Sequence, residues 1–386
     1  MNLEKEKLVI GFLTYLDPKD KKTWSGTNYK MLKALESHFE EVVVLGPIPR
    51  PRIIGGIIAR IDKLSQFLFK KRYNREQNIL KSIYYYFYLK DKINDSNIDI
   101  IFSASAGPEI AFINNKIPIC YLADATFDQL LNYYENYSNF SSLSIIESKY
   151  ISKKAIKKSN NYVYPSQWAA NFAIKKYNLK KEDTHVVKFG ANMDYIPNVD
   201  KILNRSYDSE IDLLFLGRDW VRKGGDIALK TLDTLIKQGY NVKLTVCGCV
   251  PPVKHPKMKV IPFLNKNNKS ERESFYNLLY ESHILFVPTR AECFGIVFCE
   301  ASAFGMPIVT TDTGGVTAIV ENDFNGYALP HSANAEEYAL TIKKLLDNPN
   351  LIKRMASNAL SKYEKELNWE IWGVEMKKIM INLVKK

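Results

Sequence analysis

Two glutamates, Glu292 and Glu300, stand eight positions apart in the segment TRAECFGIVFCEASAFGMPIVTTDTGG. An apolar run over residues 283–288 predicts a buried parallel strand before them, and a helical pattern continues from Phe298. A turn from such a strand into a helix presents unpaired backbone N–H groups and the positive end of the helix dipole. The turn therefore suits phosphate or sugar oxygens. A carboxylate one turn into the helix, at Glu300, can accept hydrogen bonds from the vicinal hydroxyls of a ribose.

A second group of polar residues lies in GRDWVRKGG, where Gly217 ends another predicted strand. Arg218 and Lys223 lie on either side of the loop that leads into a helix at Asp226. Ligands of open α/β sheets bind at the carboxyl ends of strands, where arginine grips phosphate bidentately and lysine supplies a point charge. Cations beside a turn are often only solvated, but two strand ends that meet on one crevice favour a diphosphate site.

Strand and helix patterns alternate along the whole chain and start twice, first at Lys7 and again at Glu210. With 386 residues and 44.4 kDa, the chain is too long for one ordinary core. The polar segment from Gly190 to Arg205 is the best candidate for a linker. We therefore expect an α/β protein of two Rossmann-like doubly wound domains, residues 1–195 and 196–368, that face a central cleft. A last helix, residues 369–386, is expected to return to the first domain.

The net charge of +12 is concentrated between Arg50 and Arg75, where eight lysines and arginines accompany one acid, Asp62. Within this segment, residues 53–72 place apolar and basic side chains at helical spacing, as an interfacial helix on anionic lipid would. A helix that packs on the core and keeps a solvated basic face would have the same sequence pattern, so both readings stay open. No base-reading motif accompanies the charge, and we expect no nucleic-acid partner.

Other classes of site lack support in the sequence. The five cysteines have neither framework spacing nor nearby histidines, so we expect no metal site and no disulfide scaffold. No Ser, Cys and His arrangement indicates a nucleophilic triad. No apolar run approaches the roughly 20 residues that span a bilayer, and the mixed-charge start is unlike a signal peptide. We therefore expect a cytoplasmic protein.

With these motifs in place, the chain resembles a family-4 retaining glycosyltransferase of the GT-B fold (glycosyl transferases group 1). The most specific shared feature is the E-x7-E pattern of Glu292 and Glu300, followed in order by the family's Glu, Ala, Gly, Pro and Gly-Gly. Supporting pieces are GRDWVRKGG, the SGT loop at residues 25–27, YPSQWAANF at 164–172 and KFGANMD at 188–194. The resemblance covers most of the chain.

The resemblance implies that residues 1–195 bind the acceptor and residues 196–368 bind a nucleotide-sugar donor. Arg218 and Lys223 would hold the donor diphosphate, Glu300 the ribose and Glu292 the transferred sugar. The full set of implied donor-binding residues is Gly26, Gly217, Arg218, Lys223, Phe263, Leu264, Glu292, Phe294, Gly295, Ile296, Val297 and Glu300. Of these, Phe263 and Leu264 would flank the base, and backbone N–H groups of residues 295–297 would contact hexose or phosphate. Gly26 would close over the diphosphate from the other domain, or is an ordinary N-cap glycine.

One position departs from the family. Many relatives carry a histidine after a strand of the first domain, where this chain has ADATFD at residues 123–128. Asp124 would take the place of that histidine among the catalytic residues, together with Glu292, Arg218 and Lys223. A carboxylate there could orient the acceptor hydroxyl, but it cannot donate a proton as imidazolium does.

The implied reaction is metal-independent transfer of a hexose-type sugar with retention of configuration, in which the departing phosphate helps to deprotonate the acceptor. The donor would be a UDP- or GDP-linked sugar, no cofactor is expected, and the acceptor would be a glycan or lipid-linked saccharide of the cell envelope. The basic helix at residues 53–72 would then place the protein on the inner face of a membrane. Two alternatives stay open: a non-catalytic glycosyltransferase-like subunit, and a sugar-nucleotide epimerase or hydrolase of the same architecture.

Overall fold

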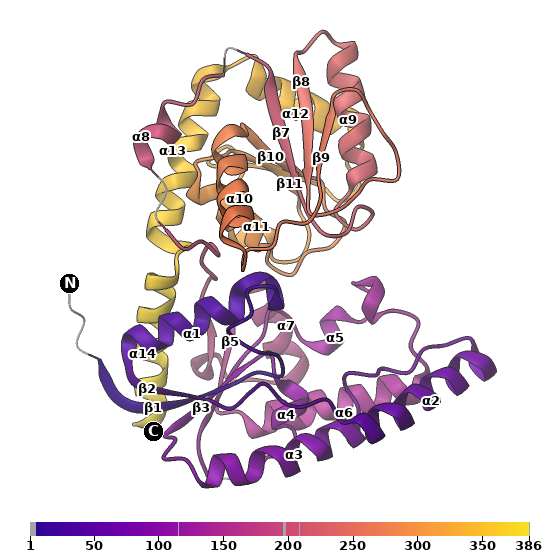
Figure 1. Ribbon diagram of the computed structural model, residues 1–386, viewed down its shortest axis with the longest axis vertical. Helices are drawn as coiled ribbons and strands as arrows, with labels where there is room; N and C mark the ends of the chain where they lie inside the picture. The colour runs from indigo at the N-terminus through magenta and orange to yellow at the C-terminus, as the bar shows by residue number, and fades with distance from the viewer. Residues whose placement is uncertain (1–4, 115, 196–197, 208, 386) are drawn as a thin grey trace. The chain divides into compact units, whose positions relative to one another are not determined.

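The computed structural model describes residues 5–114, 116–195, 198–207 and 209–385 (Figure 1). Their contacts divide the chain into two compact units. The first unit holds the described residues up to Val187 together with those from Trp372 onward, and the second runs from Lys188 to Ile371.

The first unit is built on a six-stranded parallel sheet in the order β2-β1-β3-β4-β5-β6. Its strands are β1 (Glu6–Leu13), β2 (Phe39–Val44), β3 (Ile100–Ala104), β4 (Ile119–Leu122), β5 (Asn161–Tyr164) and β6 (Thr184–Val186). Its helices are α1 (Thr27–His38), α2 (Arg52–Phe69), α3 (Ile79–Asn94), α4 (Gly107–Ile110), α5 (Phe127–Leu130), α6 (Ser142–Lys158) and α7 (Gln167–Tyr177). Helices α2, α3 and α6 lie side by side in Figure 1. The central strand β3 is buried along its whole length, as expected for a sheet covered on both faces.

Helix α14 (Trp369–Val384) packs on this first unit, as the sequence predicts. The Trp372 side chain is fully buried, and its ring meets the ring of Phe102 edge-on at 5.9 Å. At Gly373 a Cβ atom would lie 2.3 Å from the His38 ring, so the close approach of α14 to α1 requires glycine. The expected span also includes residue 386, which lies outside the described residues.

The second unit has a six-stranded parallel sheet in the order β12-β11-β10-β7-β8-β9. Its strands are β7 (Ile211–Leu216), β8 (Val242–Cys247), β9 (Met258–Ile261), β10 (Ile284–Val287), β11 (Ile308–Thr311) and β12 (Gly326–Leu329). Its helices are α8 (Val199–Leu203), α9 (Gly225–Lys237), α10 (Lys269–Glu281), α11 (Ile296–Ala303), α12 (Ala335–Leu346) and α13 (Pro349–Glu366). The strand order reverses between β7 and β10, which pair with Leu214 opposite Leu285. Open α/β sheets bind ligands at this reversal, outside the carboxyl ends of the strands.

The division between the units falls a few residues before the boundary drawn from the sequence. The segment after Val187 packs on the second unit: the Phe189 ring stacks on Trp369 at 6.0 Å, and the Ala191 N–H donates to the Leu367 carbonyl at 2.9 Å. Polar composition alone does not reveal this packing. The sequence-based boundary at residue 196, and the part of the linker at 196–197, lie outside the described residues.

The first unit also buries an acidic side chain. Glu109, on the short helix α4, is 4% exposed. Burial in a poorly solvated site raises the pKa of its carboxyl group to about 7, against the opposing influence of Lys81. The folded protein therefore keeps this proton at pH values where the unfolded chain loses it.

We predict that Glu109→Gln raises stability at pH 8 more than at pH 5. In the unfolded chain this carboxyl group ionises above pH 4.5, whereas in the folded protein its pKa is about 7. The free energy of unfolding of the wild-type protein therefore falls between these two pH values and stays level above them. The full loss is about 3 kcal/mol, and an amide in place of the carboxyl removes it. Thermal unfolding of both proteins at the two pH values measures the difference. Glu281→Gln, an exposed change on α10, is the control and should give no pH-dependent gain. An equal gain for Glu109→Gln at both pH values would refute the raised pKa.

Candidate functional site

The loops that follow β7 and β10 meet at the strand reversal of the second sheet. Gly224 has a φ of +76°, and a Cβ atom on it would lie 1.9 Å from the Pro288 carbonyl oxygen, so only glycine fits. The Arg290 N–H donates to the Arg222 carbonyl at 2.7 Å, which ties the two loops together. The sequence-based expectation that these two strand ends share one edge of the sheet therefore agrees with the structure.

Lys223 is held between these loops. Its aliphatic stem lies against Gly217, where a Cβ atom would be 2.7 Å from the lysine Cγ. Its ammonium group pairs with the Glu292 carboxylate, and both side chains are largely buried. Burial lowers the pKa of Lys223, and the charge of Glu292 opposes that shift. Arg222 lies beside the pair, with its Nη1 atom 3.6 Å from Glu292 Oε2 and its Nε atom 3.9 Å from Asp219 Oδ2, so two cations and two anions lie together at the strand ends.

The turn after Glu292 leads into α11 through Gly295, which has a φ of +96°. A Cβ atom on Gly295 would lie 2.3 Å from the Phe298 ring, so the turn depends on glycine here as well. The N–H groups of Ile296 and Val297 belong to the first turn of α11, where no intrahelical acceptor exists. These donors can therefore hold an anionic or hydroxyl-bearing ligand.

Glu300 lies one turn into α11 and is 1% exposed. Its carboxylate pairs with the ammonium group of Lys266. The same ammonium group lies 4.3 Å from the centre of the Phe275 ring, a favourable cation–π distance. The carboxyl group thus has a basic partner in a buried site, and its oxygens are hydrogen-bond acceptors.

Arg218 lies over the ring of Phe263, with its guanidinium carbon 4.2 Å from the ring centre. Phe263 is 43% exposed, and Leu264 follows it in the loop after β9. An exposed aromatic ring beside an exposed arginine offers a flat surface and a charge to a ligand. Phe294 differs from these residues: its side chain is buried against the Phe189 ring at 5.2 Å, so only its backbone is available to a ligand.

Two of the proposed residues belong to the first unit. Gly26 has a φ of +91° and stands at the N-cap of α1, after Trp24 and Ser25, which also have positive φ angles. Asp124 is half-buried and follows β4. The roles that the resemblance implies for Gly26 and Asp124 toward the donor stay predictions.

The sequence analysis missed two cations of the second unit, Lys266 and Arg222. Arg222 is adjacent to Lys223, but nothing in the sequence separates it from an ordinary solvated arginine. Lys266 comes shortly after β9 and so follows a strand end, just as Arg218 does after β7. Its place after a strand end could have identified Lys266 as a candidate from the sequence. Within the described part of the chain, no group of three or more His, Cys, Asp or Glu side chains could hold a metal ion.

Helix α2, at the basic segment of the first unit, exposes most of its large apolar side chains. Its inner side buries Ile58 together with the polar residues Asp62 and Ser65. These exposed side chains are Ile53, Ile57, Leu64, Phe67, Leu68 and Phe69. Arg60, Lys63, Lys70 and Lys71 are also exposed. Among the described residues, no helix is both long enough and apolar enough to pass through a bilayer.

Comparisons with known proteins give matches to the second unit and to the fold of the chain. Residues 200–362 match the family model described as "Glycosyl transferases group 1". An uncharacterized glycosyltransferase of Methanocaldococcus jannaschii is 27% identical over 304 residues, which cover 75% of this chain and 77% of that protein. A capsular polysaccharide biosynthesis glycosyltransferase of Staphylococcus aureus is 26% identical over 179 residues, 45% of this chain and 46% of that protein. The chain thus spans only about half the length of some curated relatives it matches.

Among solved structures, the sucrose-phosphate synthase of Thermosynechococcus elongatus superposes with a TM-score of 0.67 at 15% identity, over 98% of this chain and 100% of that one. At this identity the likeness speaks for the fold alone. The matched family segment includes the loops after β7 and β10 and the pair Glu292 and Glu300. Residues 200–362, in the second unit, are therefore similar to the glycosyl transferases group 1 family, and the chain has a GT-B fold.

Proposed function

We propose that the protein transfers a hexose-type sugar from a nucleoside-diphosphate sugar to a hydroxyl acceptor, with retention of anomeric configuration. The observation that carries this proposal is the buried Glu300 on α11, paired with Lys266 next to a helix N-terminus and to the cations that follow β7. A carboxylate for ribose and cations for a diphosphate, at the strand reversal of one sheet, match two parts of a nucleotide sugar.

The cations account for the leaving group. Lys223 and Arg222 both pair with the carboxylate of Glu292, Arg222 also lies 3.9 Å from Asp219, and Arg218 is exposed beside Phe263. A donor diphosphate would add negative charge beside these three cations. Negative charge grows on the diphosphate as the sugar leaves, and cations already fixed in place stabilise it without rearrangement. We propose on this basis that the reaction needs no divalent metal.

The ribose would be held by Glu300. Its carboxylate pairs with Lys266, and two vicinal hydroxyls can donate to its two oxygens. The adjacent N–H groups of Ile296 and Val297 would hold sugar or phosphate oxygens, so Glu300 and the α11 N-terminus would grip one donor from two sides. Whether the base is uracil or guanine stays open.

We predict that Glu300→Gln weakens donor binding by about 2 to 4 kcal/mol, because two charge-assisted hydrogen bonds become weaker neutral ones. Thermal stabilisation by a panel of nucleoside diphosphates and nucleotide sugars, with and without EDTA, measures the effect. One base family should stabilise the wild-type protein and lose that effect in the variant. Glu281→Gln is the matched control and should behave as wild type. Unchanged donor affinity in Glu300→Gln would rule out the ribose assignment.

We predict that Lys223→Ala lowers kcat more than it raises the donor KM. The lysine charge matters most when the diphosphate becomes more negative in the transition state. Steady-state kinetics with the donor identified by the binding panel measure both constants. Arg222→Ala leaves the Lys223 and Glu292 pair in place and should have a smaller effect on kcat. If Lys223→Ala raises KM and leaves kcat unchanged, the lysine binds the donor equally well in the ground state and in the transition state, and the prediction is wrong.

We further propose that α2 docks on an anionic membrane and that the acceptor is a lipid-linked saccharide or another glycan of the cell envelope. Exposed apolar side chains such as Phe67 and Leu64, flanked by exposed lysines and arginines, are the composition of an interfacial helix. The inner side buries Ile58 with Asp62 and Ser65, and most of the large apolar side chains of α2 stay exposed for the lipid.

We predict that the double change Leu64→Glu and Phe67→Glu abolishes flotation with vesicles that contain anionic phosphatidylserine. The change removes buried apolar area and adds charge that anionic lipid repels. Leu340→Glu, at an exposed leucine of α12, is the matched control and should leave flotation intact. Binding of the wild-type protein should also weaken as salt rises. Failure of the wild-type protein to float at low salt would refute the membrane proposal.

A further inference from the structure

Each glutamate of the Glu292 and Glu300 pattern pairs with a lysine from another strand end. Glu292, after β10, pairs with Lys223, which follows β7. Glu300, on α11, pairs with Lys266, which follows β9 at the edge of the sheet. Lys223 already has a part in the proposed transfer, whereas Lys266 has none beyond its contact with Glu300.

The backbone around Lys266 is fixed by the start of α10. The Lys266 carbonyl accepts from Arg272 Nη1 at 2.7 Å, and the Asn265 N–H donates to Glu271 Oε2 at 2.7 Å. The Asn268 side chain caps α10, where it accepts from the Glu271 N–H at 3.3 Å. The loop is therefore anchored on both sides of Lys266, and the point from which its side chain starts is defined without a ligand.

The Lys266 side chain has a defined direction as well. Its ammonium group lies 4.3 Å from the centre of the buried Phe275 ring and pairs with the Glu300 carboxylate. The lysine side chain is 17% exposed, against 2% for the Glu300 side chain. An ammonium group between an aromatic face and a carboxylate is attracted by both. Lys266 therefore approaches Glu300 as a fixed cation and not as a flexible surface chain.

The loop that carries Lys266 also contacts the residues proposed to bind the diphosphate. Phe263 precedes Lys266 in this loop, and its ring lies 4.2 Å from the guanidinium carbon of Arg218. Arg218 follows β7, whereas Glu300 lies on the helix that follows β10. One loop after β9 thus contacts side chains from both strands of the reversal.

Pairing with Lys266 leaves Glu300 able to accept from ribose hydroxyls. The ammonium group pairs with Oε1, and a carboxylate has about four lone-pair positions on its two oxygens. Two vicinal hydroxyls can therefore donate to this carboxylate beside the lysine. The ammonium group also offsets the negative charge of the carboxylate, which would otherwise repel the diphosphate of the same ligand.

We infer that Lys266 is a positioning residue for the donor ribose, which fixes the Glu300 carboxylate so that the site distinguishes ribose from 2′-deoxyribose. A 2′-deoxy nucleotide lacks one of the two hydroxyl donors and loses a hydrogen bond to this carboxylate. The loss is largest where the carboxylate is held in place, because a mobile side chain can follow the remaining hydroxyl. This inference rests on the proposed donor site, in which Glu300 holds the ribose.

Isothermal titration calorimetry of the full chain with UDP, GDP, dUDP and dGDP tests this inference. The wild-type protein should bind one ribonucleotide about tenfold or more tightly than its 2′-deoxy form. Lys266→Met keeps the chain length and the contact with Phe275 but removes the charge, so this ratio should fall to about threefold or less. Lys266→Arg keeps a cation and should retain most of the ratio. Lys237→Met, at an exposed lysine in the last turn of α9, is the matched control and should bind as wild type.

The double variant Lys266→Met and Glu300→Gln separates an effect through Glu300 from general damage to the site. If the lysine acts through Glu300, the double variant should have the same ratio as Glu300→Gln alone. A further loss in the double variant would overturn the inference. If Lys266→Met does not fold, Lys266→Gln, which keeps an N–H donor but no charge, takes its place in the comparison.

Loss of the ribose preference in Lys266→Met, with the preference kept in Lys237→Met, supports the inference. Equal weakening of both nucleotide forms by Lys266→Met overturns it, because the lysine then only supports the fold. Tighter binding of both forms also overturns it, because the lysine then obstructs the site. In these two cases, nucleotide binding by the wild-type protein leaves the proposed donor site standing.

Two results for the wild-type protein alone would also decide the matter. Nucleotide binding with no ribose preference overturns the role of Lys266 and the ribose assignment of Glu300, but it leaves the diphosphate site standing. A wild-type protein that binds none of the four nucleotides refutes the proposed donor site, and the inference falls with it.

Discussion

The donor site depends on one buried ion pair, between Lys223 after β7 and Glu292 after β10. Each charge would be costly to bury alone, and each has its partner only because the two strands are neighbours at the reversal of the sheet. Three glycines around this ion pair allow the chain to form it. Gly217 leaves room for the lysine stem, Gly224 lets the first loop meet Pro288, and Gly295 turns the chain from Glu292 into α11. The turn at Gly295 then fixes where α11 begins and where Glu300 lies.

Both units place their polar groups at the same point of a parallel sheet. In the second unit the reversal lies between β7 and β10, and in the first it lies between β1 and β3. At the second reversal, Lys223 and Arg222 pair with Glu292. At the first, four acids and two arginines line a cavity of about 750 Å³, and Asp62 pairs with Arg75 while Glu76 pairs with Lys81. The same architecture thus carries different side chains at its two reversals.

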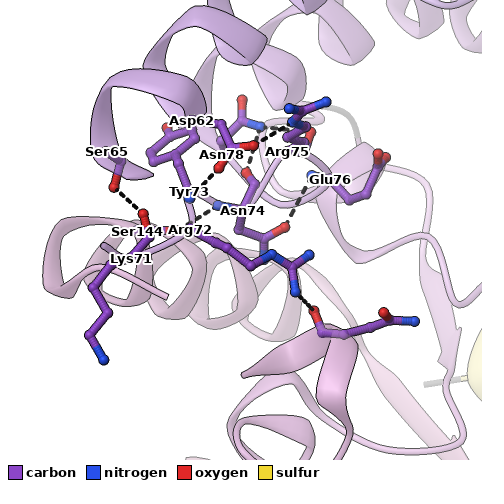
Figure 2. A network of polar contacts seen from close by, with 11 residues as sticks. Asp62, Ser65, Lys71, Arg72, Tyr73, Asn74, Arg75, Glu76, Asn78 and Ser144 are labelled. Atoms are coloured by element: carbon purple, nitrogen blue, oxygen red, sulfur yellow. Dashed lines mark hydrogen bonds and ion pairs between the residues drawn. The ribbon is translucent and has the colours of Figure 1, made fainter. Parts of the chain in front are cut away.

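The sequence predicts the fold well, because buried parallel strands give apolar runs and the helices between them have clear periodicity. It also indicates Arg218, Lys223, Glu292 and Glu300 as candidates, since these polar residues stand beside strand ends, and their roles toward a donor stay predictions. It could not decide how α2 faces, because a buried apolar stripe and an exposed one have the same spacing. The structure decides this through Asp62 and Ser65, whose bonds to the connector between α2 and α3, residues 70–78, turn these two side chains inward (Figure 2). Lys266 and Glu109 were missed because each acquires its significance from tertiary neighbours: Lys266 from Glu300, and Glu109 from the cavity that surrounds it.

Glu109 shows how a cost in stability can indicate a site. A glutamine or leucine at this position would fill similar space without a desolvated charge, so packing gives no reason for a carboxyl group. The nearby Lys81 does not solve the problem, because its ammonium group pairs with Glu76 instead. Local conflicts of this kind are expected where a residue serves a ligand that the folded chain alone does not contain. The Asp62 bonds fix the connector, and the cavity behind it is lined by Glu109, whose carboxyl group accepts from its own backbone N–H.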